Sequence, residues 1–285
     1  MQQKGIHWFP GHMQKAMREI QERLKLIDVI VEIVDSRAPR SSKNPFLENI
    51  TNTKKRIIVM SKKDLCDISK LEKWKQYYKE NNYIPVEADL NNNSDINKIL
   101  KAIAEAGKDK IERNLRKGMK PQAIRAMVIG IPNVGKSTLI NRLSKRGSAS
   151  TANTPGHTRS QQWIKVDKTL ELLDTPGILP PHYEDKEIAI HLALIGSMKE
   201  QNIPLSELLS YLLEFLMKNH LQELKERYDL KEEDLLDERK IVEGVCRRRG
   251  LLLRQGEFDY SKGEALLLKE FKEGLIVKTI IDELC

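Results

Sequence analysis

Apolar and polar residues alternate in two patterns along the first two-thirds of the chain. Short apolar runs, typical of strands buried in a parallel sheet, are each followed by a stretch with helical spacing. The runs that predict strands are 28–35, 56–60, 83–88, 126–130, 162–166 and 170–174. This alternation favours an α/β fold, a mostly parallel sheet with helices on both faces.

Helix-start signals and breakers stand between these strands. Ser69 and Glu72 form a capping-box pattern, which predicts a helix over 70–80 that opens at Ser69. A glycine and a proline within 117–122 interrupt a longer helical pattern, so this segment is expected to be a linker into the next strand.

After the last predicted strand the pattern changes. Strand signals nearly vanish, and residues 204–220 carry leucines at the spacing of an amphipathic helix. Ser261 and Glu264 predict another capped helix start. We therefore expect two domains, a sheet-containing domain over 1–182 and an all-helical domain over 183–285.

Composition adds a class of partner. The chain of 285 residues carries a formal net charge of +8, which favours a polyanionic partner, nucleic acid before a membrane. Its apolar runs are too short to span a membrane, and its first residues lack the apolar core of a secretory signal. The three cysteines are widely separated, so we expect reduced thiols and a cytoplasmic protein.

Residues 130–137, Gly-Ile-Pro-Asn-Val-Gly-Lys-Ser, match the phosphate-binding loop G-x-x-x-x-G-K-[ST]. They stand between a predicted strand and a helical pattern, the context that this motif requires. Backbone N–H groups of such a loop converge on phosphate oxygens, Lys136 would reach the β- and γ-phosphates, and Ser137 would bind Mg²⁺. Further nucleotide contacts are expected from Val134, Gly135 and Thr138.

A second phosphate-site motif, Asp174-Thr-Pro-Gly177, ends the last predicted strand. An Asp at the end of a strand beside the phosphate loop can hold the water shell of Mg²⁺, and the Gly177 N–H can meet the γ-phosphate. Between the two motifs, Thr154 and Thr158 are both available as a switch threonine that binds Mg²⁺. Thr158 is preferred, because it precedes the strand 162–166 as a switch threonine precedes its strand.

Ser61-Lys62-Lys63-Asp64 predicts a guanine-binding element, because it resembles the Asn-Lys-x-Asp sequence with which GTPases recognise the base. The Asp64 carboxylate can accept the two N–H donors on the N1 and N2 edge of guanine, and adenine offers no such pair. Lys62 can lay its methylene stem over the base. Ser61 replaces the usual Asn with a shorter side chain.

The order of these elements is unusual. Glu87 and Ala88 close a further predicted strand, where GTPases place a backbone N–H that meets guanine O6. The base-binding elements thus come first, and the phosphate loop, the switch threonine and the Asp174 motif follow. This is the usual GTPase order rotated, with the usual last helix joined through 117–122 to the usual first strand. Such a rotation preserves strand neighbours when the original termini lie close together, as domain termini often do.

The chain resembles the circularly permuted GTPases, and among them the ribosome biogenesis GTPase A family of large-subunit assembly factors. The stretches that carry the resemblance are WFPGHMQKA, DVIVEIVDSRAPRSSKNP, GIPNVGKSTLINRL, TPGHTRSQQWIKV, LLDTPGIL and GVCRRRG. The resemblance implies a circularly permuted P-loop GTPase domain followed by an all-helical C-terminal domain that contacts RNA. It further implies GTP hydrolysis promoted by the large ribosomal subunit, with Mg²⁺ and K⁺ as cofactors. Ser61 and His157 depart from the family pattern.

The resemblance also implies roles for single residues. Ras-like GTPases orient the attacking water with a Gln that here is Ile178, which cannot form a side-chain hydrogen bond. The family offers His12 instead, with His157 in the switch as a rival. Asn133 is expected to place K⁺ beside the phosphates, which would neutralise transition-state charge. The side chains expected to bind rRNA are Arg247, Arg248, Arg249 and Arg254.

Other functions stay open from the residues alone. Ser61 and Ile178 are compatible with an RNA-binding assembly scaffold whose nucleotide site is degenerate. A P-loop kinase or ATPase is disfavoured by Asp64 and Ala88. We expect a monomeric GTP hydrolase that binds GTP and GDP, acts on the large ribosomal subunit and its rRNA without a membrane, and couples hydrolysis to release or maturation.

Overall fold

The structure, a computed structural model, describes residues 6–7, 11–120, 122–145, 162–179, 182–183, 185–199, 202–254 and 256–284. It divides into two compact units, one of residues 1–186 with 280–285 and one of residues 187–279. Each unit has its own core, so the two are described separately.

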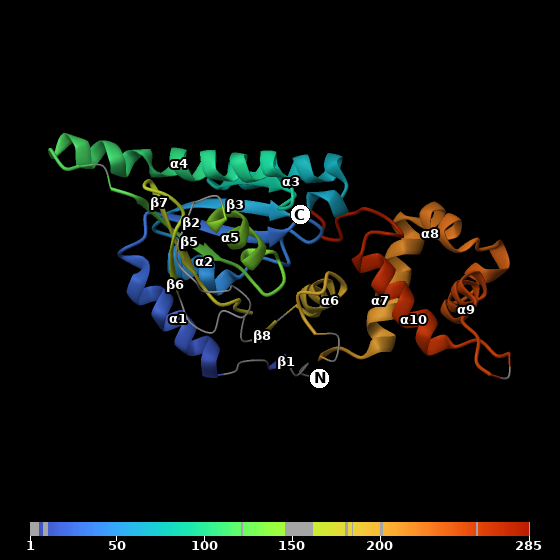
Figure 1. The fold of residues 1–285 in the computed structure, drawn as a ribbon. Coiled ribbons are helices and arrows are strands. Elements are labelled where there is room, and N and C mark those ends of the chain that lie inside the picture. Colours follow the sequence, from blue (N-terminus) through green and yellow to red (C-terminus); the bar gives the residue numbers. More distant parts are fainter. Residues whose placement is uncertain are drawn as a thin grey trace. The chain divides into compact units, whose positions relative to one another are not determined.

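The first unit is built on a six-stranded sheet in the order β4-β3-β2-β5-β7-β6 (Figure 1). Its strands are β2 (Val29–Asp35), β3 (Lys55–Ser61), β4 (Ile84–Ala88), β5 (Ile124–Ile129), β6 (Gln162–Lys165) and β7 (Leu170–Asp174). Neighbours are parallel except β6, which pairs antiparallel with β7. The central strand β2 is buried at every position, which explains its unbroken apolar run.

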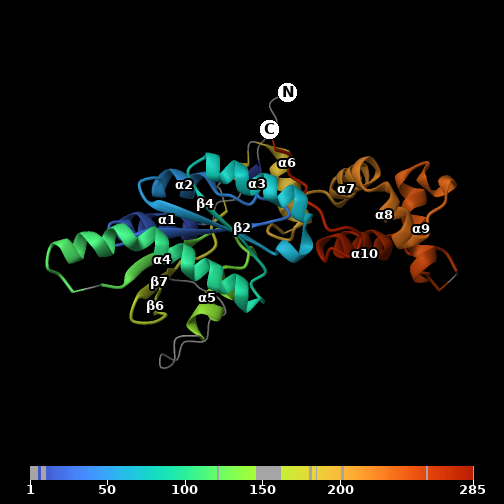
Figure 2. The same ribbon diagram turned by 90° about the horizontal axis from the view of Figure 1, so that it is seen from above.

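Helices cover both faces of this sheet (Figure 2). They are α1 (Gly11–Leu24), α2 (Pro45–Thr51), α3 (Ile68–Glu80), α4 (Asn93–Arg116) and α5 (Lys136–Ser144). The chain steps outward from β2 through α2 to β3 and through α3 to β4, and then returns across the sheet through α4 to β5. Because crossovers between parallel strands are right-handed, this reversal puts α4 on the face opposite α2 and α3, where α5 contacts it.

The strand order creates a ligand crevice. The chain leaves β2 toward β3 on one side, and it leaves the adjacent β5 toward β6 and β7 on the other side. Neighbouring strands whose connections diverge leave a crevice at their carboxyl ends, which is where open α/β sheets bind ligands. The predicted base-binding and phosphate-binding segments all follow carboxyl ends of strands in this sheet.

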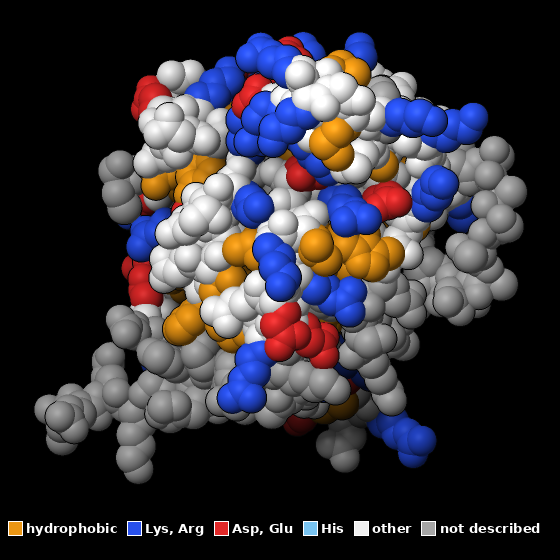
Figure 3. Space-filling model, turned by 90° about the vertical axis from the view of Figure 1, so that its left-hand side faces the viewer, with side chains coloured by type: hydrophobic (Ala, Val, Ile, Leu, Met, Phe, Trp, Pro, Cys, Tyr) orange, Lys and Arg blue, Asp and Glu red, His pale blue; other side chains and the backbone are white. Residues whose placement is uncertain are grey.

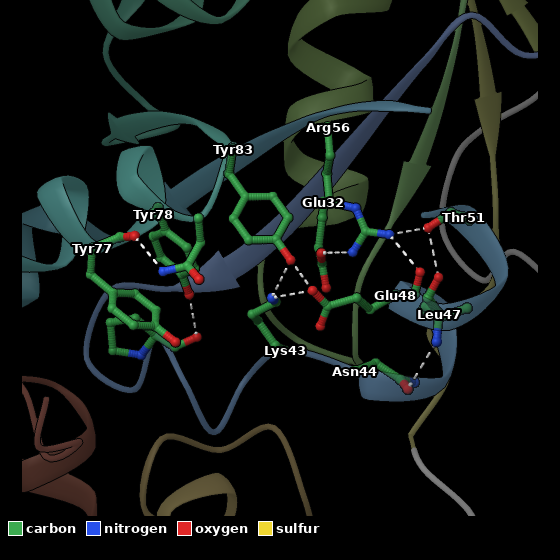
Figure 4. Close-up of polar contacts among 12 residues, drawn as sticks. Glu32, Lys43, Asn44, Leu47, Glu48, Thr51, Arg56, Tyr77, Tyr78 and Tyr83 are labelled. Atoms are coloured by element: carbon green, nitrogen blue, oxygen red, sulfur yellow. Dashed lines mark hydrogen bonds and ion pairs between the residues drawn. The ribbon is translucent and has the colours of Figure 1, made fainter. Parts of the chain in front are cut away.

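A buried polar network joins β2, β3 and α2 (Figure 4). Glu32 is fully buried, and one guanidinium nitrogen of Arg56 donates to its carboxylate at 2.8 Å. The other terminal nitrogen of Arg56 donates to the Glu48 carbonyl at 3.1 Å. Lys43 and Tyr83 both bind the Glu48 carboxylate. Burial raises the pKa of Glu32, and the guanidinium of Arg56 opposes this rise. The network fixes α2, whose first residues lie beside the crevice.

The second unit is helical. Its helices are α6 (Lys186–Leu194), α7 (Leu205–Asn219), α8 (Leu221–Tyr228), the short 3₁₀ helix η3 (Glu232–Leu235), α9 (Glu238–Arg249) and α10 (Tyr260–Lys272). Leu208, Leu212 and Leu216 of α7 are buried at helical spacing, as the sequence pattern predicts. In the described part of this unit, extended pairing is limited to a bridge between Leu252 and Phe258.

Two helix starts differ in detail from the prediction. The Asp67 carboxylate caps α3 by accepting from Ser69 N at 2.8 Å, and the Asp259 carboxylate caps α10 by accepting from Lys262 N at 3.1 Å. In each case an aspartate two residues before the serine is the capping residue, because a carboxylate accepts strongly and favours the positive end of the helix dipole. The helices were predicted correctly, but Ser69 and Ser261 were wrong as caps.

The last residues of the chain pack on the first unit. The Asp282 carboxylate accepts from the backbone N–H groups of Arg40 and Ser41 at 2.6 and 2.8 Å, and Ile280 is buried in a core cluster of that unit. The helical domain expected over 183–285 therefore ends earlier than predicted. An apolar tail pattern indicates burial but not which core receives the side chains.

Within the described ranges, no helix combines the length and the apolar character that a membrane span requires. Two of the cysteines, Cys66 and Cys246, are buried free thiols, and burial raises the pKa of Cys66 to about 12.

Candidate nucleotide-binding site

The loop between β5 and α5 has the backbone of a phosphate-binding loop. Asn133 and Gly135 adopt left-handed conformations, with φ of 61° and 108°, and they turn the chain sharply into α5. The helix N-terminus then offers its unpaired N–H groups and its dipole to an anion. Position 130 requires glycine, because a Cβ there would lie 2.6 Å from the Ile33 carbonyl oxygen of β2.

Lys136 is nearly buried and is held by its own loop. Its Nζ donates to the carbonyl oxygens of Gly130 at 3.0 Å and Ile131 at 2.8 Å. Burial lowers the pKa of Lys136 to about 8, although the Asp174 carboxylate favours the charged form. A Cβ on Gly177 would lie 2.9 Å from the same Nζ, so the ammonium stands between the two predicted phosphate motifs.

The described residues offer oxygen ligands that suit Mg²⁺. Ser137 and Thr138 are exposed in the first turn of α5, and the buried Asp174 ends β7. Among the described residues no group of three or more His, Cys, Asp or Glu side chains could hold a metal. A hydroxyl and one carboxylate nevertheless fit Mg²⁺, which usually takes its other ligands from phosphates and water. Thr158 and His157 lie outside the described residues.

Ile178 occupies the place of the water-orienting glutamine and is buried. Its N–H donates to the Gly130 carbonyl at 3.4 Å, and its own carbonyl accepts from Asn44 Nδ2 at 2.7 Å. The segment after Gly177 is thereby joined to the phosphate loop on one side and to α2 on the other. Asn44 was not predicted. Its signal is an Asn directly before a proline, typical of a helix N-cap, and the same side chain also caps α2.

Three strand ends lie side by side at the base-binding end. Asp35 is in register with Ser61, and Ser61 with Ala88. The fully buried Ser61 hydroxyl lies 2.6 Å from the Val134 carbonyl oxygen and 3.0 Å from that of Val34. The shorter serine thus still joins the base-binding segment to the phosphate loop.

Asp35 is a second residue that the sequence analysis missed. Arg37 binds its carboxylate with two nitrogens, at 2.9 and 2.7 Å, and Lys62 Nζ lies 2.8 Å away. Burial favours the neutral acid, but the two cations outweigh it, and the pKa of Asp35 falls to about 2. Asp35 therefore fixes the Lys62 ammonium and leaves the methylene stem available to a base. The available signal is an Asp that ends a buried apolar run and precedes an Arg by two residues.

Asp64 is the open group of this end. It is exposed and makes no hydrogen bond to any described residue. Its neighbours are anchored instead, Lys63 to Asp95 at 2.6 Å and Glu87 to Lys75 at 2.6 Å. The carboxylate that the sequence predicts to read guanine is thus free to accept two donors while the surrounding loop is fixed.

His12, the residue expected to orient the attacking water, is described only by its backbone. His12 lies in the first turn of α1, and its side chain is outside the described part of the chain. The preceding segment β1 (Ile6–His7) pairs antiparallel with β8 (His182–Tyr183). This backbone pairing therefore connects two segments, the one that precedes His12 and the one that follows Ile178.

The four arginines expected to bind rRNA are divided into two kinds. Arg247 and Arg249 form ion pairs within the helical unit, at 2.6 Å to a carboxylate of η3 and 3.0 Å to a carboxylate of α10. All four arginines are exposed, but Arg248 and Arg254 make no ion pair with any described residue. The first two are thus engaged by carboxylates of their own unit, and the second two remain available to a partner.

Comparisons with known proteins identify the family. A family model described as 50S ribosome-binding GTPase matches residues 125–242. The chain is 44% identical to the ribosome biogenesis GTPase A of Bacillus licheniformis, over 94% of each chain. It belongs to the ribosome biogenesis GTPase A family. The member from Bacillus cereus is 42% identical, over 96% of this chain and 92% of that one. The GDP-bound YlqF structure from Thermotoga maritima shares the fold, with a TM-score of 0.67, 22% identity, and 93% and 99% of the two chains covered.

Membership of the ribosome biogenesis GTPase A family establishes the activity. The chain is a P-loop enzyme that binds and hydrolyses GTP, in a family named for ribosome biogenesis. The predicted fold, a circularly permuted P-loop GTPase with a mostly parallel sheet, is confirmed. The kinase and ATPase alternatives, and the RNA-binding scaffold with a degenerate nucleotide site, have no comparable support.

Proposed function

We propose that this GTPase acts in the cytoplasm in assembly of the large ribosomal subunit, and that the subunit and its rRNA stimulate hydrolysis. Hydrolysis is then coupled to release of the enzyme or to maturation of the particle. The observation that carries the proposal is Ile178, a buried apolar side chain where a water-orienting glutamine is usual. An enzyme without that group needs another one, and a partner that positions it would switch hydrolysis on.

The proposed phosphate site uses Lys136, Ser137, Asp174, Gly177 and Thr158. On binding GTP, the Lys136 ammonium leaves the carbonyl oxygens of its own loop and meets the β- and γ-phosphates. Ser137 and Thr158 would hold Mg²⁺, with Asp174 reaching it through water, and the ion would supply positive charge against the phosphates. The Gly177 N–H donates to the γ-phosphate.

Two further groups are proposed for catalysis. Asn133, exposed in the phosphate loop, would hold K⁺ beside the phosphates, and the cation would offset transition-state charge. His12 orients the attacking water, and its segment is joined by backbone pairing to the chain that follows Ile178. At the base site, Asp64 accepts the guanine N–H pair, Lys62 covers the ring, and the Ala88 N–H meets O6.

The deciding experiment compares GTP hydrolysis with purified large subunits, with small subunits and with neither. We expect slow turnover alone, at least tenfold faster turnover with large subunits, and little response to small ones. The same assay in sodium instead of potassium buffer tests the proposed K⁺ site. Equal turnover in all three samples would contradict the proposal and favour a function outside subunit assembly.

A further inference from the structure

The sheet has a second functional candidate at the edge opposite the crevice, where β2, β5 and β7 begin; we call this the start edge. Figure 3 views the molecule from this side and shows lysine and arginine side chains around separate apolar patches. Several large apolar side chains here are exposed, including Trp163 at 38% and Leu26 at 44%. Exposed aromatic and basic side chains together indicate a binding surface more than a solvated face.

An open hollow of about 320 Å³ lies on the start edge, lined by Leu26, Arg125, Trp163, Lys165 and Glu171. Arg125, Glu171 and Lys165 form one row across β5, β7 and β6. Trp163 precedes Lys165 by two residues in β6, so both side chains stand on the same face of the sheet. The Arg125 guanidinium lies 5.2 Å from the centre of the Trp163 ring and donates to Glu171 at 3.0 Å.

Basic side chains predominate at the start edge, although Asp167, in the turn after β6, is exposed there and accepts from Thr169. Two other carboxylates here are half-buried and paired, Asp28 with Lys110 at 2.7 Å and Glu171 with Arg125 at 3.0 Å. The helix α4 projects beyond the sheet at this end and adds basic side chains from its last turn and from the following loop (Figures 1 and 2). The basic side chains near this edge that make no ion pair with any described residue include Lys25, Lys117, Lys120, Lys165 and Lys168.

A single-stranded nucleic acid is typically recognised by a flat aromatic ring, a guanidinium beside it and surrounding ammonium groups. Bases stack on tryptophan and on arginine planes, and lysines bind the phosphates on either side. An acidic protein would satisfy the lysines but would leave the ring without its complement. The hollow is also remote from the crevice, so a ligand here leaves the nucleotide site accessible.

We propose that the start edge binds RNA, with an unpaired base stacked on Trp163 between Arg125 and Leu26 and backbone phosphates on Lys165 and Lys168. The inference rests on the proposed function, because the RNA would be rRNA presented by the large subunit. It adds an RNA contact on the GTPase unit itself, separate from the arginines of the helical unit.

The test measures binding of the full chain, with a non-hydrolysable GTP analogue, to large subunits and to their deproteinised rRNA over a range of salt concentrations. Trp163→Ala should weaken both by about 10-fold without changing the salt slope, because stacking releases no counterions, and Trp163→Phe should retain most of the affinity. Lys165→Ala with Lys168→Ala should lower the slope by about one to two, because each phosphate contact contributes about 0.7–0.9.

The matched control is Lys73→Ala with Lys79→Ala, which removes the same charge from exposed positions on α3. It should leave the salt slope and the affinity nearly unchanged, and every variant should bind GTP as the parent does. Parent-like rRNA binding by both start-edge variants would overturn the inference, and so would a loss confined to intact subunits, which would indicate a ribosomal protein. If the parent chain itself does not bind large subunits, the proposed function fails instead.

Discussion

At the scale of single residues, the base site combines anchored and open side chains. Asp35 fixes Lys62, and Asp95 fixes Lys63, so neither lysine can move freely. Asp64 alone among these groups is exposed without a hydrogen-bond partner in the described structure. We therefore expect this site to recognise the base with the Asp64 carboxylate, while the ion pairs of Lys62 and Lys63 hold its shape.

Replacing Asp64 by Ala should weaken GTP binding by about 100-fold and abolish the preference over ATP, because two hydrogen bonds to a charged group are lost. Ser61→Ala should weaken GTP by only about fivefold, since it removes one neutral tie to the phosphate loop, and should keep the base preference. Calorimetric titration with GTP and ATP measures both effects. If ATP competes equally with GTP in the parent enzyme, the base-site assignment is wrong.

The pKa of about 8 at Lys136 makes nucleotide affinity depend on pH. Phosphates favour the ammonium form, so bound nucleotide raises this pKa and binding takes up a proton wherever the free lysine is neutral. Affinity should therefore be steady near pH 7 and fall by about 10-fold from pH 7.5 to 9. The variant Lys136→Arg keeps its charge over this range and should lose this part of the dependence. An unchanged pH profile in Lys136→Arg would show that another group titrates.

His12 tests the proposed catalytic assignment. His12→Ala should leave GTP and subunit binding nearly intact while subunit-stimulated hydrolysis falls by about 10–10³-fold, the usual scale for a general acid–base or water-orienting group. His157→Ala is the comparison, because it lies in the predicted switch and could affect nucleotide binding as well. Parent-like stimulated turnover in His12→Ala, together with a loss in His157→Ala, would assign the water to His157.

At the scale of elements, the sequence predicts most of the first unit, because buried parallel strands leave apolar runs that need no knowledge of the fold. All six predicted strands are present in the sheet. The two-residue strands β1 and β8 leave no such pattern. Asn44 and Asp35 were missed for a different reason, because each acts on a residue that is distant in the sequence. Asn44 acts on Ile178, 134 residues away, and a single sequence does not reveal such long-range partners.

Asn44 joins α2 to the segment that follows Gly177, and replacing it should reveal the effect of this connection. Asn44→Ala removes the cap of α2 and the hydrogen bond to the Ile178 carbonyl, so the free energy of unfolding should fall by about 1–2 kcal/mol. Stimulated GTP hydrolysis should fall by about 10-fold, because the Gly177 segment loses its position. Asn92→Ala is the matched control, since Asn92 caps α4 and makes no hydrogen bond to the described part of the segment that follows Gly177. If both variants hydrolyse GTP equally, Asn44 is only a helix cap.

At the scale of the whole molecule, the rotated chain order connects the GTPase unit to the helical unit at both ends of the latter. The chain enters the helical unit from the segment that follows the Gly177 motif, and it leaves at residue 279 to return to the GTPase unit. On the return, Asp282 binds the loop after Asp35, the residue that fixes Lys62. We therefore expect a change at the γ-phosphate or at the base site to be transmitted to the helical unit through these covalently connected segments.

The helical unit should bind rRNA through the arginines that its own fold leaves unpaired. Arg248→Ala with Arg254→Ala should weaken large-subunit binding and lower its salt slope by about one to two, with unchanged GTP affinity. Arg247→Ala with Arg249→Ala removes the same charge but breaks ion pairs to Asp234 and Glu270, so it should mainly lower the unfolding temperature. Binding over a salt series, together with thermal unfolding, separates the pairs. If the two double variants have the same salt slope, ion pairing within the unit does not decide which arginines bind RNA.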